Sequence, residues 1–409
     1  MKDKSLFIMV IFFGITLSAI GDYLEDGTVK YKQGDFDGAI ADFTKAIAED
    51  PDNASGYNGR AVAEVGKNDL DDAMKDFNKL IELDPNNPEI YENRAGAEIW
   101  KKDYAAAVAD CNRALALKPD DAQAYYQRAL AKQDNNEWEG ALADYNQAIK
   151  LNYVDAYNNR GNVKRALHDL AGSLADSSKA IELQPANSAA YFSRALTERA
   201  LGNYEAAIED YTRVIQLKPE WDAYVNRGSA RMHRGETGAA LLDYNKAIEL
   251  HPNDPMAYVG RGNIEQASSN FDNALADFSK AIAANPQYAV AYNDRAWCAY
   301  FKSDYDSTIS DATRAIELDP TYGYAYGTRG WARYEKGDMA GALGDCKKAV
   351  QLEGIGTTNA AGDQGMFEFL NGNYKSAATC WETAVLDDPS IKGLIQPWID
   401  KAKAKSTQP

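Results

Sequence analysis

The stretch AYFSRALTERALGNYEAAIEDYTRVIQLKP, from Ala190 to Pro219, decides the fold of this chain. Its markers are Tyr191, then Arg194, then Asp210 sixteen residues after the Arg, and the final Pro. The Arg–Asp step of sixteen recurs in eight further places, and most neighbouring copies lie 34 residues apart. A period of this length is typical of a stacked repeat array. The further places are Arg60–Asp76, Arg94–Asp110, Arg128–Asp144, Arg160–Asp176, Arg227–Asp243, Arg261–Asp277, Arg295–Asp311 and Arg329–Asp345.

Each copy has the pattern of two helices joined by a tight turn. Apolar and small residues recur at three- and four-residue spacing in 191–201 and again in 204–217. Gly202 and Asn203 between these segments supply a helix stop and a helix start. Pro219 ends the second helix, because proline lacks an N–H and restricts the residue before it. The sequence therefore predicts an antiparallel helical hairpin in each copy, with consecutive hairpins stacked through their apolar faces.

These markers resemble the tetratricopeptide repeat. The likeness rests on the Tyr and Arg of the first helix, the small residue after the Arg (Ala195, Gly228), the Ala of the second helix (Ala207) and the closing Pro. It is most similar to the bacterial variety with Arg-Gly or Arg-Ala in the first helix and Ala-Asp-Tyr or Ala-Asp-Phe in the second. We number the positions of a repeat so that the Tyr is 4, the Arg 7, the Asp 23 and the Pro 32. The resemblance implies an all-α, right-handed solenoid, and it leaves the partner open because such repeats serve many partners.

The expected architecture is one array of about eleven hairpins closed by a C-terminal capping helix. The array spans 22–390, and the capping helix and a polar tail occupy 391–409. An apolar stripe at helical spacing in 391–399 predicts the cap. In the eleventh repeat Gln364 and Cys380 stand in the Arg and Asp places. The expected repeats are 22–53, 54–87, 88–121, 122–153, 154–187, 188–220, 221–254, 255–288, 289–322, 323–356 and 358–390.

Residues 1–21 lie outside the repeats and have the layout of a secretory signal peptide. Lys2 and Lys4 precede an apolar run, and small residues stand just before Asp22. The run is too short for a typical membrane span. The sequence predicts cleavage before Asp22 and an exported protein, periplasmic or extracellular. Membrane tethering is the alternative if the segment is not cleaved.

Composition and motifs argue against several functions. The formal net charge is −17, so nucleic acid is not an expected partner, because phosphate binding needs a basic face. The histidines and cysteines show no metal-ligand spacing, and Cys111 and Cys346 fall where other copies carry a core Tyr or Phe. The sequence has no Gly-rich phosphate loop and no Gly-x-Ser-x-Gly motif. We expect no enzyme activity, no metal and no cofactor.

The Arg at position 7 and the Asp at position 23 face each other in the predicted hairpin, because each lies eight residues from the turn. Nine matched copies argue for a structural role and against a catalytic one. Losing one partner of a buried ion pair costs roughly 3–5 kcal/mol. The sequence therefore predicts a ladder of structural ion pairs, among them Arg60–Asp76, Arg194–Asp210 and Arg261–Asp277.

The resemblance also implies where a ligand binds. In tetratricopeptide arrays the concave groove is lined mainly by positions 2, 5, 9 and 12 of the first helix. In the fifth and sixth repeats this stripe is polar and partly basic, with Asn158, Asn162, Arg165 and Arg199. In the ninth and tenth repeats it is aromatic, with Trp297, Tyr300, Tyr324, Trp331 and Tyr334, and Arg333 stands next to the last of these, where it can orient an acidic group of a ligand.

Two interpretations of the aromatic residues stay open. Either they form an exposed wall, since Trp and Tyr dominate binding hot spots, or they are buried between helices. No Lys stands at position 2 or 5, so the Lys and Asn set with which chaperone-binding members hold a peptide carboxylate is missing. The sequence predicts a non-enzymatic, exported scaffold that binds a protein or peptide in the groove. The alternatives are glycan or cell-wall binding through the aromatic wall, and an accessory subunit of a glycosyltransferase system.

Overall fold

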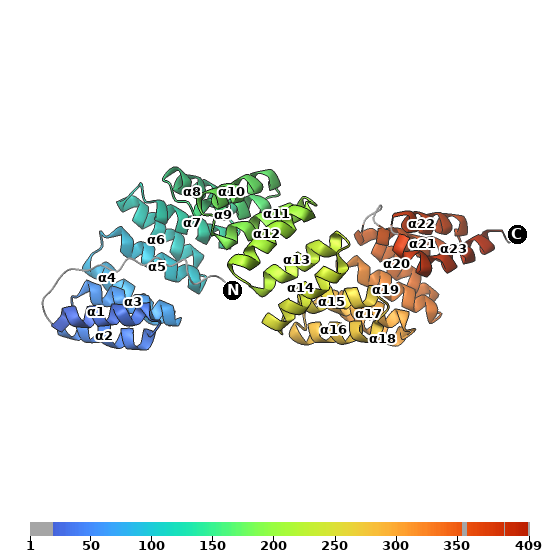
Figure 1. The fold of residues 1–409 in the computed structure, drawn as a ribbon, viewed down its shortest axis with the longest axis horizontal. Coiled ribbons are helices and arrows are strands. Elements are labelled where there is room, and N and C mark those ends of the chain that lie inside the picture. Colours follow the sequence, from blue (N-terminus) through green and yellow to red (C-terminus); the bar gives the residue numbers. More distant parts are fainter. Residues whose placement is uncertain (1–18, 354–357, 388, 408–409) are drawn as a thin grey trace. The chain divides into compact units, whose positions relative to one another are not determined.

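The computed structural model describes residues 19–353, 358–387 and 389–407, which are helical almost throughout (Figure 1). Twenty-three α-helices and one short 3-10 helix follow one another, and no strand occurs within these ranges. The all-α repeat solenoid predicted from the sequence is therefore confirmed.

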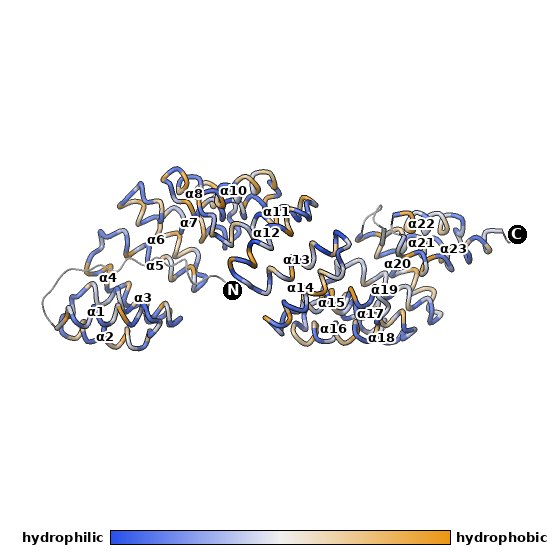
Figure 2. Tube along the Cα trace, in the orientation of Figure 1, coloured by the Kyte–Doolittle hydropathy of each residue, from blue (hydrophilic) through white to orange (hydrophobic). Residues whose placement is uncertain are grey.

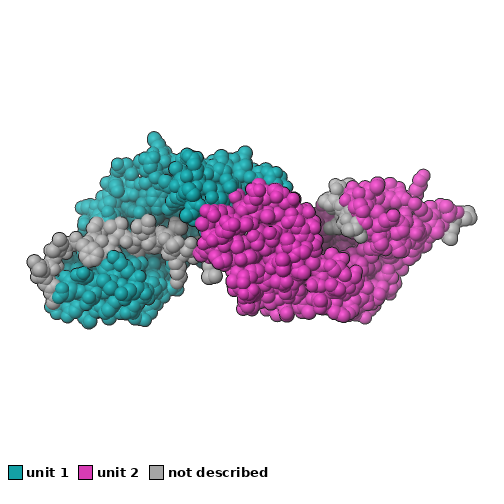
Figure 3. Space-filling model, in the orientation of Figure 1, with its two compact units in different colours: residues 1–203 teal, residues 204–409 magenta. Residues whose placement is uncertain are grey.

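The chain divides into two compact units, Met1–Asn203 and Tyr204–Pro409 (Figure 3). The helices of the first unit are α1 (Ala19–Lys32), α2 (Phe36–Glu49), α3 (Ala54–Lys67), α4 (Leu70–Leu83), α5 (Pro88–Lys101), α6 (Tyr104–Leu117), α7 (Ala122–Asp134), α8 (Trp138–Lys150), α9 (Ala156–Ala166), α10 (Leu170–Leu183) and α11 (Ser188–Ala200). Those of the second are α12 (Tyr204–Leu217), α13 (Trp221–His233), α14 (Thr237–Leu250), α15 (Pro255–Ala267), α16 (Phe271–Ala284), α17 (Ala289–Phe301), α18 (Tyr305–Leu318), α19 (Gly323–Glu335), α20 (Met339–Glu353), α21 (Thr358–Leu370), α22 (Tyr374–Asp387), the 3-10 helix Pro389–Ile391 and α23 (Lys392–Ser406).

The turns stand where the sequence signals place them. Gly202 after α11 has a φ of +80° and Asn68 after α3 has a φ of +73°, a left-handed conformation that Gly and Asn adopt at low cost. Several helices, though not α4, begin with Asx caps. The side chain of Asn53, for example, accepts a hydrogen bond from the backbone N–H of Gly56 in α3. These local signals set the length of each helix.

Each hairpin builds its own small core from the second helix. In α4, Phe77 is fully buried together with Ala73 and Leu80. Cys111 and Cys346 take the place of the large residue in their repeats and are buried with free thiols. Hydrophobic and hydrophilic residues alternate along the helices (Figure 2), which gives each helix one apolar face for packing.

The small residue after the Arg is required by the ring opposite. A Cβ added to Gly262 of α15 would lie 2.7 Å from Cε1 of Phe278 in α16. Real Cβ atoms do not approach a ring this closely, so α15 and α16 pack at this distance only with a glycine at position 262.

The first helices of successive repeats touch one another as well as their own partners. In the first unit α5 contacts α7 and α9 contacts α11, and in the second unit α13, α15, α17 and α19 contact one another in sequence. In the second unit the first helices α13, α15, α17 and α19 therefore form a continuous row. The ligand-binding positions were predicted on such first helices.

At the N-terminus, α1 begins at Ala19, and Ile20 packs against a core that contains Leu24 and Phe43. Most of the predicted signal peptide, 1–18, lies outside the described residues. Among the residues that the structure describes, none of the helices combines the length and the apolar character that crossing a membrane requires.

Candidate functional site

Two of the aromatic residues predicted to line the groove, Tyr300 and Trp331, lie in a buried cluster. Trp331 is 3% exposed and Tyr300 is 8% exposed. The ring centroid of Trp331 lies 6.3 Å from that of Trp381 in α22 and 5.2 Å from that of Trp398 in α23. The interpretation as an exposed wall is therefore wrong for Tyr300 and Trp331. Rings of the eleventh repeat and of the C-terminal helix pack against Trp331, and Tyr300 packs against Trp331 and Tyr305.

Trp331 is also fixed by a polar contact. Its Nε1–H donates to Oδ1 of Asp363 in α21 at 2.8 Å. Burial raises the pKa of Asp363 to about 7, against the lowering effect of this hydrogen bond. The indole and the carboxyl group thus satisfy each other inside the protein.

The neighbouring aromatic residues belong largely to the same cluster. Trp297 stacks on Tyr300 at a centroid distance of 5.2 Å. The hydroxyl of Tyr334 accepts a hydrogen bond from Nζ of Lys401 at 2.8 Å. Tyr324 differs from the others, because it is 40% exposed.

Arg333 does not stand free at a rim. Its Nη1 lies 2.7 Å from Oδ2 of Asp345 in the same hairpin, and its Nε lies 3.7 Å from Oδ2 of Asp338. The expectation that Arg333 orients an acidic group of a ligand is therefore wrong, because carboxylates of the chain itself already hold its guanidinium.

The polar residues predicted in the fifth and sixth repeats stay partly exposed. Asn158, Asn162 and Arg165 on α9 and Arg199 on α11 are all partly accessible to solvent, and α9 and α11 are in contact. Oδ1 of Asn158 is shielded from solvent and accepts no hydrogen bond from the described residues. We call these four residues the middle stripe. It offers amides and guanidinium groups, which bind peptide backbone and carboxylates.

The Arg–Asp ladder is the most regular polar feature of the protein. Nε and Nη2 of Arg261 donate to the two oxygens of Asp277 at 2.7 and 2.8 Å. The side chain of Asp277 is 7% exposed and that of Arg261 is 22% exposed. Arg194 belongs to the first unit and Asp210 to the second. The same two-pronged contact joins Arg60–Asp76, Arg94–Asp110, Arg128–Asp144, Arg160–Asp176, Arg227–Asp243, Arg295–Asp311 and Arg329–Asp345.

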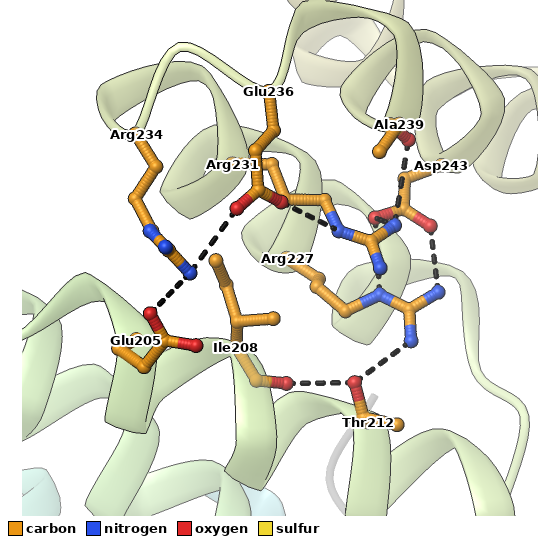
Figure 4. A network of polar contacts seen from close by, with 9 residues as sticks. All are labelled: Glu205, Ile208, Thr212, Arg227, Arg231, Arg234, Glu236, Ala239 and Asp243. Atoms are coloured by element: carbon orange, nitrogen blue, oxygen red, sulfur yellow. Dashed lines mark hydrogen bonds and ion pairs between the residues drawn. The ribbon is translucent and has the colours of Figure 1, made fainter.

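A third contact, which sequence reasoning missed, links each Arg to the preceding repeat. Nη1 of Arg261 donates to Oδ1 of Asn245 at 2.7 Å, and Nη1 of Arg227 donates to Oγ1 of Thr212 at 3.0 Å (Figure 4). The signal was present in the sequence, because a Ser, Thr or Asn follows the Asp by two residues in each of repeats 1 to 9. Each of these Arg side chains therefore connects its own repeat to the preceding one by a hydrogen bond.

In four repeats a second cation, at position 11, joins the ladder Asp, and in the first repeat, which has no ladder Arg, Lys30 at this position pairs with Asp42. In the seventh repeat Nη1 of Arg231 lies 2.7 Å from Oδ2 of Asp243, and its Nε lies 3.9 Å from Glu236 (Figure 4). The second and third repeats carry Glu64 and Glu98 at this position instead. The five cations are Lys30, Lys132, Lys164, Arg231 and Arg333.

Three glutamates of the second and third repeats are buried. Two of them stand at position 11, where some other repeats have a Lys or Arg. Glu64, Glu92 and Glu98 are 4–8% exposed, and one oxygen of each is shielded from solvent without a hydrogen-bond partner among the described residues. Burial raises the pKa of Glu64 to about 7 and those of Glu92 and Glu98 to about 8, and an aspartate near each adds repulsion. These carboxyl groups hold protons near neutral pH.

The stability of the first unit should consequently fall as the pH rises from about 4.5 to about 8, and level off above that. In the unfolded chain these glutamates ionise near their usual 4.5, so above that pH the folded state binds more protons and loses stability as they are removed. Urea unfolding measured on both sides of this range tests the effect. The double variant Glu92→Gln, Glu98→Gln should flatten the pH dependence, whereas the exposed control Glu139→Gln should not. An unchanged slope in the double variant would contradict the assignment.

No group of three or more His, Cys, Asp and Glu side chains in the described ranges is arranged to hold a metal ion. The polar features above are hydrogen bonds and ion pairs between side chains.

Comparison with known proteins points to one repeat family. A model of the tetratricopeptide repeat matches residues 24–88, 65–122, 158–220, 192–255 and 259–322. The chain is 37% identical over 78 residues to serine/threonine-protein phosphatase 5 of Rattus norvegicus, which is 19% of this chain and 16% of that protein. It is 31% identical over 102 residues to DnaJ homolog subfamily C member 3 of Homo sapiens, which is 25% of this chain and 20% of that protein. The matches thus span a fifth or less of these relatives.

Among solved structures, the chain is similar to one in the complex of Cut9 with Hcn1 from the APC/C. The TM-score is 0.52 at 15% identity, and the match covers 95% of this chain and 84% of that one. At this identity the likeness concerns the fold alone.

Proposed function

Because the chain belongs to the tetratricopeptide repeat family, whose members bind protein or peptide partners, we propose that it is a scaffold that holds an extended segment of a partner protein along the middle stripe. The observation that carries this proposal is the contrast between the two faces considered. The residues of the middle stripe are partly accessible to solvent, whereas Tyr300 and Trp331 are covered by the chain itself.

The chemistry of the stripe suits a segment with acidic side chains. The amides of Asn158 and Asn162 supply donors and acceptors for a peptide backbone. The guanidinium group of Arg199, which is partly accessible, supplies charge-assisted hydrogen bonds for carboxylates. The chain as a whole is acidic, with a formal net charge of −17, so this basic site gives the stripe a selectivity that the rest of the surface lacks.

Photo-crosslinking in the native host tests the proposal. A photoreactive residue in place of Asn162 should capture a discrete protein, and Arg165→Glu together with Arg199→Glu should reduce the captured amount by about tenfold or more. The photoreactive residue in place of Arg213, which is exposed on α12, should not capture that protein, and Arg213→Glu is the charge control. Capture that is equal at positions 162 and 213, or insensitive to the charge reversals, would contradict the middle stripe as the site.

We also propose that the protein is exported. This rests on the basic start, the apolar run and the small residues in 1–21. Mass spectrometry of the protein from its native host should find Asp22 at the N-terminus. Such cleavage removes the first three residues of α1, including Ile20. A full-length chain in the cytoplasm would contradict export.

The other functions considered have weaker support. Glycan binding depended on an open aromatic wall, and Tyr300 and Trp331 are buried. The repeat fold is generally a non-catalytic binding scaffold, and we propose no enzymatic activity. No contact in the described residues favours an accessory role in a glycosyltransferase system.

A further inference from the structure

The ninth repeat lacks the second cation that other repeats place beside the ladder Asp. Its position 11 is Ala299, where the seventh and tenth repeats have Arg231 and Arg333. A cavity of about 520 Å³ opens there, and Ala299, Asp304 and Asp311 are among its lining residues. The short side chain of Ala299 thus leaves space where a long cationic side chain lies in those other repeats.

The seventh repeat shows what this space accommodates when it is filled. The guanidinium of Arg231 is held by three acceptors: Oδ2 of Asp243 at 2.7 Å, the carbonyl oxygen of Ala239 at 3.4 Å and the carboxylate of Glu236 at 3.9 Å (Figure 4). Counted from the ladder residue Arg227, the cradle for a guanidinium therefore consists of the Asp sixteen residues on, the backbone carbonyl of the residue twelve on and the acid nine on.

The ninth repeat keeps the whole cradle. Counted from Arg295, the three equivalent positions are Asp311, Ser307 and Asp304, and all three line the cavity. The tenth repeat uses the same two acid positions, Asp345 and Asp338, to hold Arg333 at 2.7 and 3.7 Å. In the ninth repeat the acceptors are thus present without the cation that they hold elsewhere.

These acceptors are within reach of solvent. The side chain of Asp311 is 14% exposed, compared with 4% for Asp243 and 7% for Asp345. Asp304 is exposed, and one of its oxygens caps α18 by accepting from the N–H of Ser307 at 3.1 Å. A ligand can therefore approach the cradle from outside.

The two cations that line the cavity are already engaged. Arg295 donates to both oxygens of Asp311 and to Oγ of Ser279, and Lys302 pairs with Asp272. The groups that remain available to a ligand at the cavity are the carboxylate of Asp304 and the second lone pairs on the oxygens of Asp311. The site is suited to a cation and not to an anion.

We propose that the cavity over Ala299 binds a guanidinium group, which takes the place that the guanidinium of Arg231 has in the seventh repeat. The group belongs either to a small guanidine compound or to an Arg side chain of a partner protein. The contacts expected are to Asp311, Asp304 and the backbone carbonyl of Ser307. The site lies on α17 and α18, whereas the middle stripe lies on α9 and α11, so either one can fail without the other.

Calorimetric titration of the full chain with methylguanidinium tests the site, with methylurea as a neutral probe of the same shape. We expect methylguanidinium to bind about tenfold more tightly or better, because charged hydrogen bonds are the stronger ones. Asp304→Asn, which keeps a capping oxygen, should weaken the binding, and Asp338→Asn in the tenth repeat should not.

The decisive variant is Ala299→Arg, which supplies the guanidinium from the chain itself. It should raise the melting temperature and abolish methylguanidinium binding, whereas Ala267→Arg, at an exposed place on α15, should do neither. Equal binding of the two probes, or methylguanidinium binding that survives in a folded Ala299→Arg variant, would overturn the proposal.

A short Gly/Ser peptide with one central Arg separates the two sources of the group. Binding about tenfold tighter than that of methylguanidinium, and lost in Ala299→Arg, identifies a partner's side chain, because flanking backbone adds contacts. Binding of the peptide no tighter than that of methylguanidinium identifies a free guanidine compound.

Discussion

Replacing Trp331 by alanine should lower the free energy of unfolding by about 4 kcal/mol. The side chain is 3% exposed and touches the rings of Tyr300, Trp381 and Trp398, so its removal leaves a large cavity in the cluster. The substitution also removes the hydrogen-bond donor of the buried Asp363, and an unpaired buried polar group is costly in itself.

Hydrogen exchange of α19 to α23 measures this effect where it occurs, because stability in a repeat array is local and the chain need not unfold in one step. The control is Tyr324→Ala in the same helix, which removes an aromatic ring that is 40% exposed and should change protection little. If Trp331→Ala left the protection of α23 intact, the C-terminal helix would not depend on this ring. A selective loss of partner binding without loss of protection would restore Trp331 as a ligand-binding residue.

The second large effect concerns the ladder. Arg261→Ala and Asp277→Ala should each cost about 3 kcal/mol, the lower end of the range for buried pairs, because Arg261 is about a fifth exposed at 22%. Each change leaves the other side chain without its two-pronged partner. The double variant should be less destabilised than the sum by about 1 kcal/mol or more.

Urea unfolding of the four proteins gives this coupling energy. Arg213→Ala is the matched control, since Arg213 is exposed on α12 and its Nη1 donates to Oε1 of Gln216 one turn away. Strictly additive losses would mean that the two side chains do not stabilise each other, and the ladder would then have no energetic role in the second unit.

The hairpins were predictable because their signals are local. The left-handed turn at Gly202, the caps of the Asn53 type and the Ala-aromatic-Ala spacing of the second helix act within one repeat. Because the pattern occurs nine times, it can be recognised even though single repeats depart from it. Serial order then brings neighbouring hairpins together, so the solenoid follows from the repeat.

The exposure of the aromatic residues was not predictable in the same way. Helical spacing gives the face on which Trp331 lies, but not what covers that face. Trp398, which packs at 5.2 Å from it, comes from the last helix, outside the repeat pattern.

The contact from the Arg to the preceding repeat was missed for a different reason. Thr212 and Asn245 are ordinary surface residue types, and only their fixed distance from the following Arg distinguishes them.

That contact has a consequence for how such a chain changes in evolution. The donor at each joint is always an arginine, whereas the acceptor is Thr, Asn or Ser without apparent order, as Thr44, Asn78 and Ser279 show. Any of the three accepts one hydrogen bond from the same nitrogen. A repeat can therefore be duplicated, deleted or exchanged with another, and the new junction is complete at once, without a compensating substitution. The repeats are therefore interchangeable at this hydrogen bond, and the number of repeats in the array can change by whole hairpins.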